Sequence, residues 1–343
     1  MLRDHAIFAF HRHQQLGDAA LLDDAIRDMR EASSLTPPTH IDRPQQLRDL
    51  GAFLLDRFTL SGDVVDLEEC INLLNEVLQK TSNHGRLHAN TNLNLGLAYW
   101  ETFSQSENKP ADRLKRAFDV FVAVIESPAA LPFDKFSAFG NLVAVYLCLG
   151  NPAGAAGMVS EWAALMPRVV PQSLDIPDKQ YILAQLSNVA SEMAAILLSV
   201  DESPYRVLSV LESSRGIIMS SLGAIRAPVS DLQKVDRYLA EDYLRCRDAL
   251  DKSTVFQQHA DQRYEADKKF QESIAAIRKV PGFDRFLLPP TEDEFKAYAS
   301  SGPIAVLNVN KRRRDALIIQ RSGLSVVSLP NLHIEDIHRL NLA

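Results

Sequence analysis

Residues 35–44, LTPPTHIDRP, lie between two stretches that both have the apolar spacing of a helix. Proline lacks a backbone donor and clashes with the preceding helical turn, so the two prolines end the first stretch. When the sequence is shifted along itself by 45 residues, Gly17-Asp18 falls on Gly62-Asp63 and Leu50-Gly51 falls on Leu95-Gly96. Self-similarity at a fixed period of a few tens of residues is typical of a solenoid. We therefore interpret residues 35–44 as the connection inside one repeat.

Each repeat is predicted to contain two amphipathic helices, because apolar residues recur at spacings of three and four. The first helices cover residues 21–35 and 67–80, and the second helices cover residues 45–58 and 90–103. Glycine inside a helix costs up to about 1 kcal/mol relative to alanine. Gly51 and Gly96 occupy the same place in both second helices, which indicates a close approach between helices. Gly62 is expected to end a helix, and Asp63 to cap the next one.

The pattern weakens and then changes towards the C-terminus. A third helix pair begins at Ala111 and a fourth, less regular pair follows Gly150. Longer helices follow from Tyr181, and a charged helical hairpin is predicted to end at Pro281-Gly282. Three short segments rich in Val and Ile then predict a strand meander at 303–310, 315–320 and 324–330. We expect three regions, namely helical repeats at 1–175, long helices and a hairpin at 176–285, and strands at 286–343.

The predicted fold class is mainly α: a right-handed α-α superhelix of helix pairs, followed by a helical hairpin and a small β meander. The chain of 343 residues has a net charge of −7, whereas nucleic-acid binders usually carry a basic face. Three cysteines cannot form a disulfide framework, which favours a reducing compartment. There is no signal-peptide pattern and no apolar run of the roughly 20 residues that a membrane helix needs. We expect a soluble, cytoplasmic protein that binds neither nucleic acid nor membrane.

The repeats and the segments C-terminal to them resemble a known arrangement. The unit that spans residues 35–71 resembles the long tetratricopeptide-like repeats of fungal multidomain proteins, in which they precede a CHAT domain, a caspase-like cysteine peptidase domain. VLSVLESSRGIIMSSL at 207–222 looks like the helix that introduces a CHAT domain, and APVSDL at 227–232 fits the region after that helix. Residues 301–332, SGPIAVLNVNKRRRDALIIQRSGLSVVSLPNL, look like the first CHAT strands. The resemblance covers nearly the whole chain.

The chain also departs from this family. In the family, the catalytic histidine lies in a His-Gly context and the cysteine in a Ser-Ala-Cys context, both after the opening strands, and neither context occurs there in this sequence. The last residues read as an incomplete helix after the first strands, and Ala6 aligns with Gly51 of a second helix. We therefore expect a fragment that starts within a repeat and stops before the catalytic part of a CHAT domain.

The three cysteines are weighed first as nucleophiles. Cys70 and Cys148 are predicted to pack in the core, because free cysteine is among the most buried residue types. Cys246 has two flanking arginines that would lower its pKa, but it also continues an apolar stripe and is expected to pack in the seam of the hairpin. No cysteine has a histidine partner in the sequence pattern, so no catalytic residue is assigned.

The other candidate sites are weak. Two histidine pairs, His11/His13 and His84/His88, lack a third ligand at a suitable spacing, and His88 aligns with Arg43 of the connection. His333 and His338 are expected in the terminal helix, outside the catalytic context of the family. No phosphate-binding, dinucleotide-binding or zinc-protease motif occurs. Lys311–Arg314 reads either as a nuclear signal or, because strands flank it, as a charged hairpin turn. We assign no cofactor and no metal.

Stacked helix pairs form a concave surface that suits binding rather than bond-breaking. The expected function is a non-catalytic protein-interaction scaffold, the sensor and linker portion of a CHAT-type protease, with other proteins or peptides bound on the concave surface. The alternative is a cysteine endopeptidase whose catalytic half is encoded downstream or supplied in trans. The sequence does not fix the oligomeric state, the partner or the activating signal.

Overall fold

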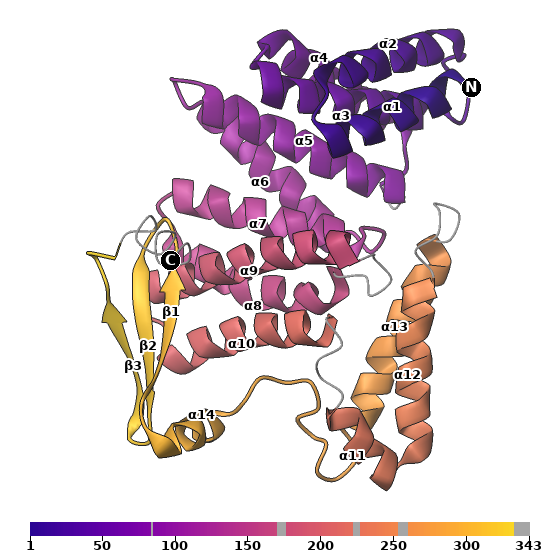
Figure 1. Cartoon of the computed structure of the whole chain (residues 1–343). Coiled ribbons are helices and arrows are strands. Elements are labelled where there is room, and N and C mark those ends of the chain that lie inside the picture. Colours follow the sequence, from indigo (N-terminus) through magenta and orange to yellow (C-terminus); the bar gives the residue numbers. More distant parts are fainter. Residues whose placement is uncertain (84, 170–175, 222–226, 253–259, 333–343) are drawn as a thin grey trace. The chain divides into compact units, whose positions relative to one another are not determined.

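The computed structural model describes residues 1–83, 85–169, 176–221, 227–252 and 260–332. These residues form fourteen α-helices, most of them packed as consecutive pairs, and then a three-stranded antiparallel sheet, so the mainly α fold class is confirmed (Figure 1). The chain divides into two compact units, Met1–Gly150 and Asn151–Ala343. Among the described residues no helix has both the length and the apolar character that a membrane crossing requires.

Unit 1 consists of seven helices. They are α1 (Leu2–Leu16), α2 (Ala19–Leu35), α3 (Arg43–Ser61), α4 (Val64–Lys80), α5 (Arg86–Gln105), α6 (Ala111–Glu126) and α7 (Pro132–Cys148). Two of the turns between them are as short as the sequence predicts. Gly17 and Gly62 adopt left-handed φ angles of 69° and 72°, which glycine tolerates because it has no side chain. Asp18 and Asp63 then cap α2 and α4 by accepting the backbone N–H two residues ahead, at 3.0 Å in each case.

The longer connection at 35–44 is held by the side chains that flank it. The Thr36 hydroxyl donates to the carbonyl of Ala32 at 2.8 Å, and Arg43 donates to the carbonyls of Thr36, at 2.8 Å, and Ser33. These bonds satisfy carbonyl groups that the end of α2 leaves unpaired.

In the next repeat, side chains also hold the connection between the helices. The Thr81 hydroxyl donates to the carbonyl of Val77 at 2.8 Å and lies 3.2 Å from Nδ1 of His88. The interpretation of His88 as a connection residue is confirmed.

The position of the repeat boundary differs from the prediction. α3 packs more extensively on α4 than on α2, and α5 packs more extensively on α6 than on α4. A Cβ atom at Gly51 would lie 2.9 Å from Cδ2 of Leu74 in α4, and one at Gly96 would lie 2.6 Å from Cε1 of Phe121 in α6. The predicted close approach is therefore confirmed, but it joins α3 to the helix that follows. Residues 35–44 link two helix pairs rather than the two helices of one repeat, and α1 is the first helix of a pair.

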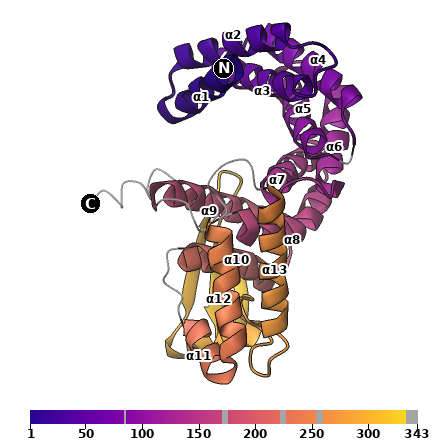
Figure 2. The ribbon, with the colours of Figure 1, turned by 90° about the vertical axis from the view of Figure 1, so that its right-hand side faces the viewer.

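Unit 1 is curved when it is viewed along its helices. Figure 2 shows α1, α3, α5 and α7 on its inner, concave side and α2, α4 and α6 on its outer side. The inner helices contact one another directly, since α3 packs against α5 and α5 against α7. Buried side chains such as Leu54, Leu74 and Phe121 fill the space between the two rows of helices.

Unit 2 begins with a helical group. α8 (Pro152–Val169), α9 (Ile176–Ser199) and α10 (Pro204–Ser221) pack on one another. Met193, Ile196 and Leu197 of α9 are almost completely buried. The group serves as the support on which the C-terminal sheet is built.

A helical hairpin follows, as the sequence predicts. α11 (Ala227–Val235) leads into α12 (Arg237–Lys252), which pairs with α13 (Ala260–Ile277). The hairpin has a core of its own, in which the Tyr243 ring lies 5.4 Å from the ring centres of both Phe270 and Phe286.

The C-terminal sheet confirms the predicted meander. After α14 (Glu292–Tyr298) and the 3-10 turn Ala299–Ser301, the strands β1 (Ile304–Val309), β2 (Arg314–Gln320) and β3 (Gly323–Ser328) pair in the order β1-β2-β3. Val306, Leu317 and Val326 face one another across the three strands. β1 contacts α9, β3 contacts α10 and β2 contacts α14, so these helices support the sheet (Figure 1).

Polar contacts fix the β1–β2 end of the sheet on α9. Asn308 Nδ2 donates to the carbonyl of Ser191 at 3.2 Å, and Arg312 Nε donates to Glu192 at 2.5 Å. Arg313 binds the fully buried Asp315 with two hydrogen bonds of 2.7 and 2.8 Å. The basic run at 311–314 is therefore a hairpin turn, as one of its two interpretations predicts, and two of its arginines are paired.

Candidate interaction site

Neither Cys70 nor Cys246 is an activated thiol. Cys70 is fully buried on α4, and burial together with Glu69 raises the pKa of its thiol to about 12. Cys246 on α12 is half-buried, and burial raises its pKa as well. Arg245 acts to lower this pKa, but burial and Asp242 outweigh it. Arg245 is paired with Asp242, and Arg247 with Asp248. The core prediction for Cys70 is thus confirmed.

The prediction for Cys148 is wrong. Cys148 is the last residue of α7 and is exposed. The last buried residue of that helix is Val145, Leu147 is half-buried, and Leu149, just past the helix end, is 57% exposed. The final turn therefore extends beyond the core, which an apolar sequence pattern alone does not reveal.

The three thiols should consequently differ in reactivity. With an aromatic disulfide reagent at about pH 8, we expect Cys148 to react within seconds to minutes, Cys246 more slowly, and Cys70 only after denaturant is added, because only an accessible thiolate is nucleophilic. Stopped-flow absorbance on the wild type and on Cys148→Ser checks this order. A fast phase that survives in Cys148→Ser would contradict the assignment.

The histidines serve structural roles where the structure describes them. His13 is buried and its Nδ1 lies 2.7 Å from the carbonyl oxygen of Asp18, whereas His11 on the same helix is exposed. His84, His333 and His338 lie outside the described residues. Within the described part of the chain, no three His, Cys, Asp or Glu side chains are placed to hold a metal ion.

The most distinctive polar arrangement is a cluster of charges on the inner helices of unit 1. We name it the concave cluster, and its members are Arg3 (α1), Arg48 and Asp49 (α3), Arg86 and Asn90 (α5) and Asp134 (α7). Each inner helix contributes at least one member. The cluster therefore exists only when the four inner helices are stacked in order.

The contacts within the cluster centre on its two carboxylates. Arg48 Nη2 lies 2.9 Å from Asp49 Oδ1, and Arg3 Nη2 lies 3.7 Å from Asp49 Oδ2. The amide of Asn90 donates to Asp134 Oδ1 at 3.4 Å. Three arginines and two aspartates leave a net charge of +1 when all are ionised.

Several of these polar atoms are buried without a hydrogen-bond partner. They include Oδ2 of both Asp49 and Asp134, Nε of Arg3 and Arg48, and Oδ1 of Asn90. Buried polar atoms in folded proteins are nearly always paired, and an unpaired one costs about 1–3 kcal/mol. Buried polar atoms without partners lower stability, and proteins tolerate such groups mainly at binding sites.

Burial also disturbs the ionisation of the cluster. Burial raises the pKa of Asp49 and of Asp134, and the nearby arginines only partly counteract this. Burial lowers the pKa of Arg48, and repulsion from Arg3 and Arg86 adds to the decrease. The charges of Arg48, Asp49 and Asp134 are thus incompletely compensated by their neighbours.

Sequence reasoning missed these residues, although the repeat contains a signal for them. In the 45-residue alignment Arg3 falls on Arg48, and Gln45 falls on Asn90. The Gln45 amide donates a hydrogen bond to Asp49 at 3.2 Å. A polar residue therefore recurs at equivalent helix positions. An amphipathic pattern alone assigns such residues to solvent, so their burial became visible only when the helices were stacked.

Comparison with known proteins adds no assignment to this picture: no protein-family model matches the chain, and no curated protein matches it significantly.

Proposed function

We propose that the chain is a non-catalytic protein-interaction scaffold that binds a peptide segment of another protein on the concave face of unit 1. The concave cluster supports this proposal, because it gathers partly unpaired polar groups from four helices on one curved surface. Helix repeats of this kind use their extended curved faces for binding. We further propose that the helix pairs are tetratricopeptide-like.

We also propose that the region after the repeats corresponds to the entry of a CHAT domain. The order of elements favours it, since long helices, a helical hairpin and a strand meander follow one another as the resemblance implies. The alternative function, a cysteine endopeptidase, receives no support from Cys70 or Cys246. Thiol catalysis needs an accessible thiolate beside a base, and neither Cys70 nor Cys246 has a lowered pKa.

The scaffold proposal predicts peptide binding that depends on the concave cluster. Peptides selected from a random display library on the purified full chain should lose affinity on the order of tenfold in Arg48→Gln, because anchoring arginines contribute strongly to interfaces. The matched control is Lys115→Gln, which removes one exposed positive charge from the outer helix α6 and should leave affinity within about twofold. Fluorescence anisotropy measures both.

Two results would contradict the proposal. One is the failure to select any peptide whose binding distinguishes Arg48→Gln from Lys115→Gln. The other is hydrolysis of the selected peptides by the purified chain that is lost in Cys148→Ser or Cys246→Ser, since this would establish the peptidase instead.

A further inference from the structure

The concave cluster has two layers of opposite charge. The side chains of Arg3 and Arg48 remain 34% and 24% exposed, and Arg86 is exposed. The carboxylates lie beneath them, since the side chain of Asp49 is 9% exposed and Asp134 is 5% exposed. A partner that approaches this face meets guanidinium groups first. The arginines are therefore the groups that contact a ligand, while the buried acids hold them in place.

We propose that the concave cluster is a proton-linked binding site for an acidic side chain, Asp or Glu, of the peptide segment that unit 1 holds. This inference rests on the function proposed above and adds the chemistry of the ligand. Arg48 forms an ion pair with Asp49, with Nη2 2.9 Å from Oδ1, and a guanidinium group can bind a second carboxylate through its other donors.

Charge decides between the ligand classes. A Lys or Arg side chain would approach three arginines and a net charge of +1, which is repulsive in a half-buried site. A neutral amide would leave the excess positive charge uncompensated. A carboxylate would neutralise that charge and relieve the repulsion that Arg3 and Arg86 exert on Arg48.

The linkage to protons follows from the buried acids. Asp49 is faced by Arg3 of α1 and by Gln45 and Arg48 of α3. A bound carboxylate adds negative charge beside Asp49 and competes for the same arginines. The complex should therefore raise the pKa of Asp49 further.

Asp134 responds in the same way. It is faced by Arg86 and Asn90 of α5, Arg48 of α3 and the backbone of Leu131. In the free protein the pKa of each acid already lies above its ordinary value of 3.8. In the complex we expect both pKa values to be higher still. The complex thus binds more protons than the free protein does, and affinity must increase as the pH falls through these pKa values.

The test uses the full chain and a rhodamine-labelled peptide of alternating Glu and Gly with an amidated C-terminus. We expect binding at least about tenfold tighter than that of the matched Gln peptide, and tighter as the pH is lowered from about 7 to about 5.5, where Glu is still mostly ionised. Arg86→Met, which changes an exposed side chain, should weaken the Glu peptide severalfold. Asp49→Asn with Asp134→Asn removes both titrating carboxylates, so the affinity that remains should no longer increase as the pH falls over this range.

A second control peptide distinguishes the source of the carboxylate. A Gln peptide with a free C-terminal carboxylate should bind no better than its amidated form. Circular dichroism and the fluorescence of Trp100 verify that each variant is folded. Any of three results would overturn the inference. They are equal binding of the Glu and Gln peptides, tighter binding of the free C-terminus than of the Glu side chains, and a pH dependence that persists in the double Asn variant.

Failure of this inference is separable from failure of the scaffold proposal. One outcome is that the library yields peptides that lack acidic residues but still bind less tightly to Arg48→Gln. That result would support the scaffold proposal and contradict the carboxylate site. If neither the library peptides nor the Glu peptide bind in a way that distinguishes Arg48→Gln from Lys115→Gln, the scaffold proposal fails, and the carboxylate site fails with it.

Discussion

Replacing Arg57 by Met should destabilise unit 1 by about 3 kcal/mol, because it leaves a buried carboxylate without its partner. Arg57 of α3 binds Asp66 of α4 through two hydrogen bonds of 2.7 and 2.6 Å and also contacts Asp23 of α2 at 3.0 Å. The side chain of Asp66 is only 4% exposed. Its place in the first turn of α4 compensates for part of the lost charge, which sets the effect at the low end of the range for buried pairs.

The matched control is Arg30→Met. Arg30 of α2 also binds a carboxylate on α4 through two contacts, to Glu69 at 2.5 and 3.3 Å, but both side chains are about one third or more exposed. Exposed pairs contribute about 0.2–1 kcal/mol, so Arg30→Met should cost no more than that. Urea unfolding in a Trp162→Phe background measures both, because Trp100 is then the single tryptophan and reports on unit 1. Equal costs for the two variants would show that burial of Asp66 does not matter.

Gly96→Leu should have the second largest effect, a loss of about 2–3 kcal/mol. A Cβ atom at position 96 would lie 2.6 Å from the ring of Phe121, which is fully buried and cannot move aside. Gly51→Leu should cost less, about 1–2 kcal/mol, because its neighbour is the end of the Leu74 side chain at 2.9 Å. Leucine also favours a helix over glycine by up to about 1 kcal/mol, which these values already include.

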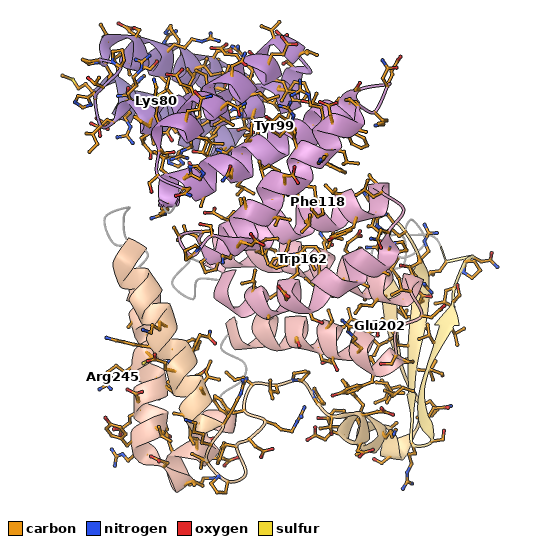
Figure 3. All side chains as sticks on the ribbon, turned by 180° about the vertical axis from the view of Figure 1, so that it is seen from behind. Lys80, Tyr99, Phe118, Trp162, Glu202 and Arg245 are labelled. Carbon is orange, nitrogen blue, oxygen red and sulfur yellow. The ribbon has the colours of Figure 1, made fainter. Side chains whose placement is uncertain are left out.

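The control for the glycine series lies in unit 2. Gly157 of α8 has nothing within 4 Å of a Cβ atom and is exposed, so Gly157→Leu should stabilise the helix by about 0.5–1 kcal/mol. Trp162 on the same helix reports on it when Trp100 is replaced by Phe (Figure 3). Combining Gly96→Leu with Phe121→Leu should recover part of the loss, since the two sites share one contact. Additive losses in the double variant would mean that the close approach at Gly96 is not the cause.

Local elements could be predicted well because their causes lie within a few residues. Prolines end α2, Gly62 and Asp63 form the turn into α4, and Val- and Ile-rich segments form the three strands. The position of the repeat boundary could not be predicted in the same way. Periodicity fixes the length of a repeat but not which neighbouring helices pack most closely. The packing of α3 on α4 and of α5 on α6, with Gly51 against Leu74 and Gly96 against Phe121, decided that.

The sequence by itself determined the mainly α class, the 45-residue repeat and the burial of Cys70, because spacing and residue type carry that information. Only the tertiary structure decided that Cys148 is exposed and that Arg3, Arg48, Asp49 and Asp134 meet on one face. These residues are spread over four helices and more than a hundred positions. Their proximity, their burial and their incomplete pairing arise from stacking, and no local pattern records how deeply a polar side chain becomes buried between stacked helices.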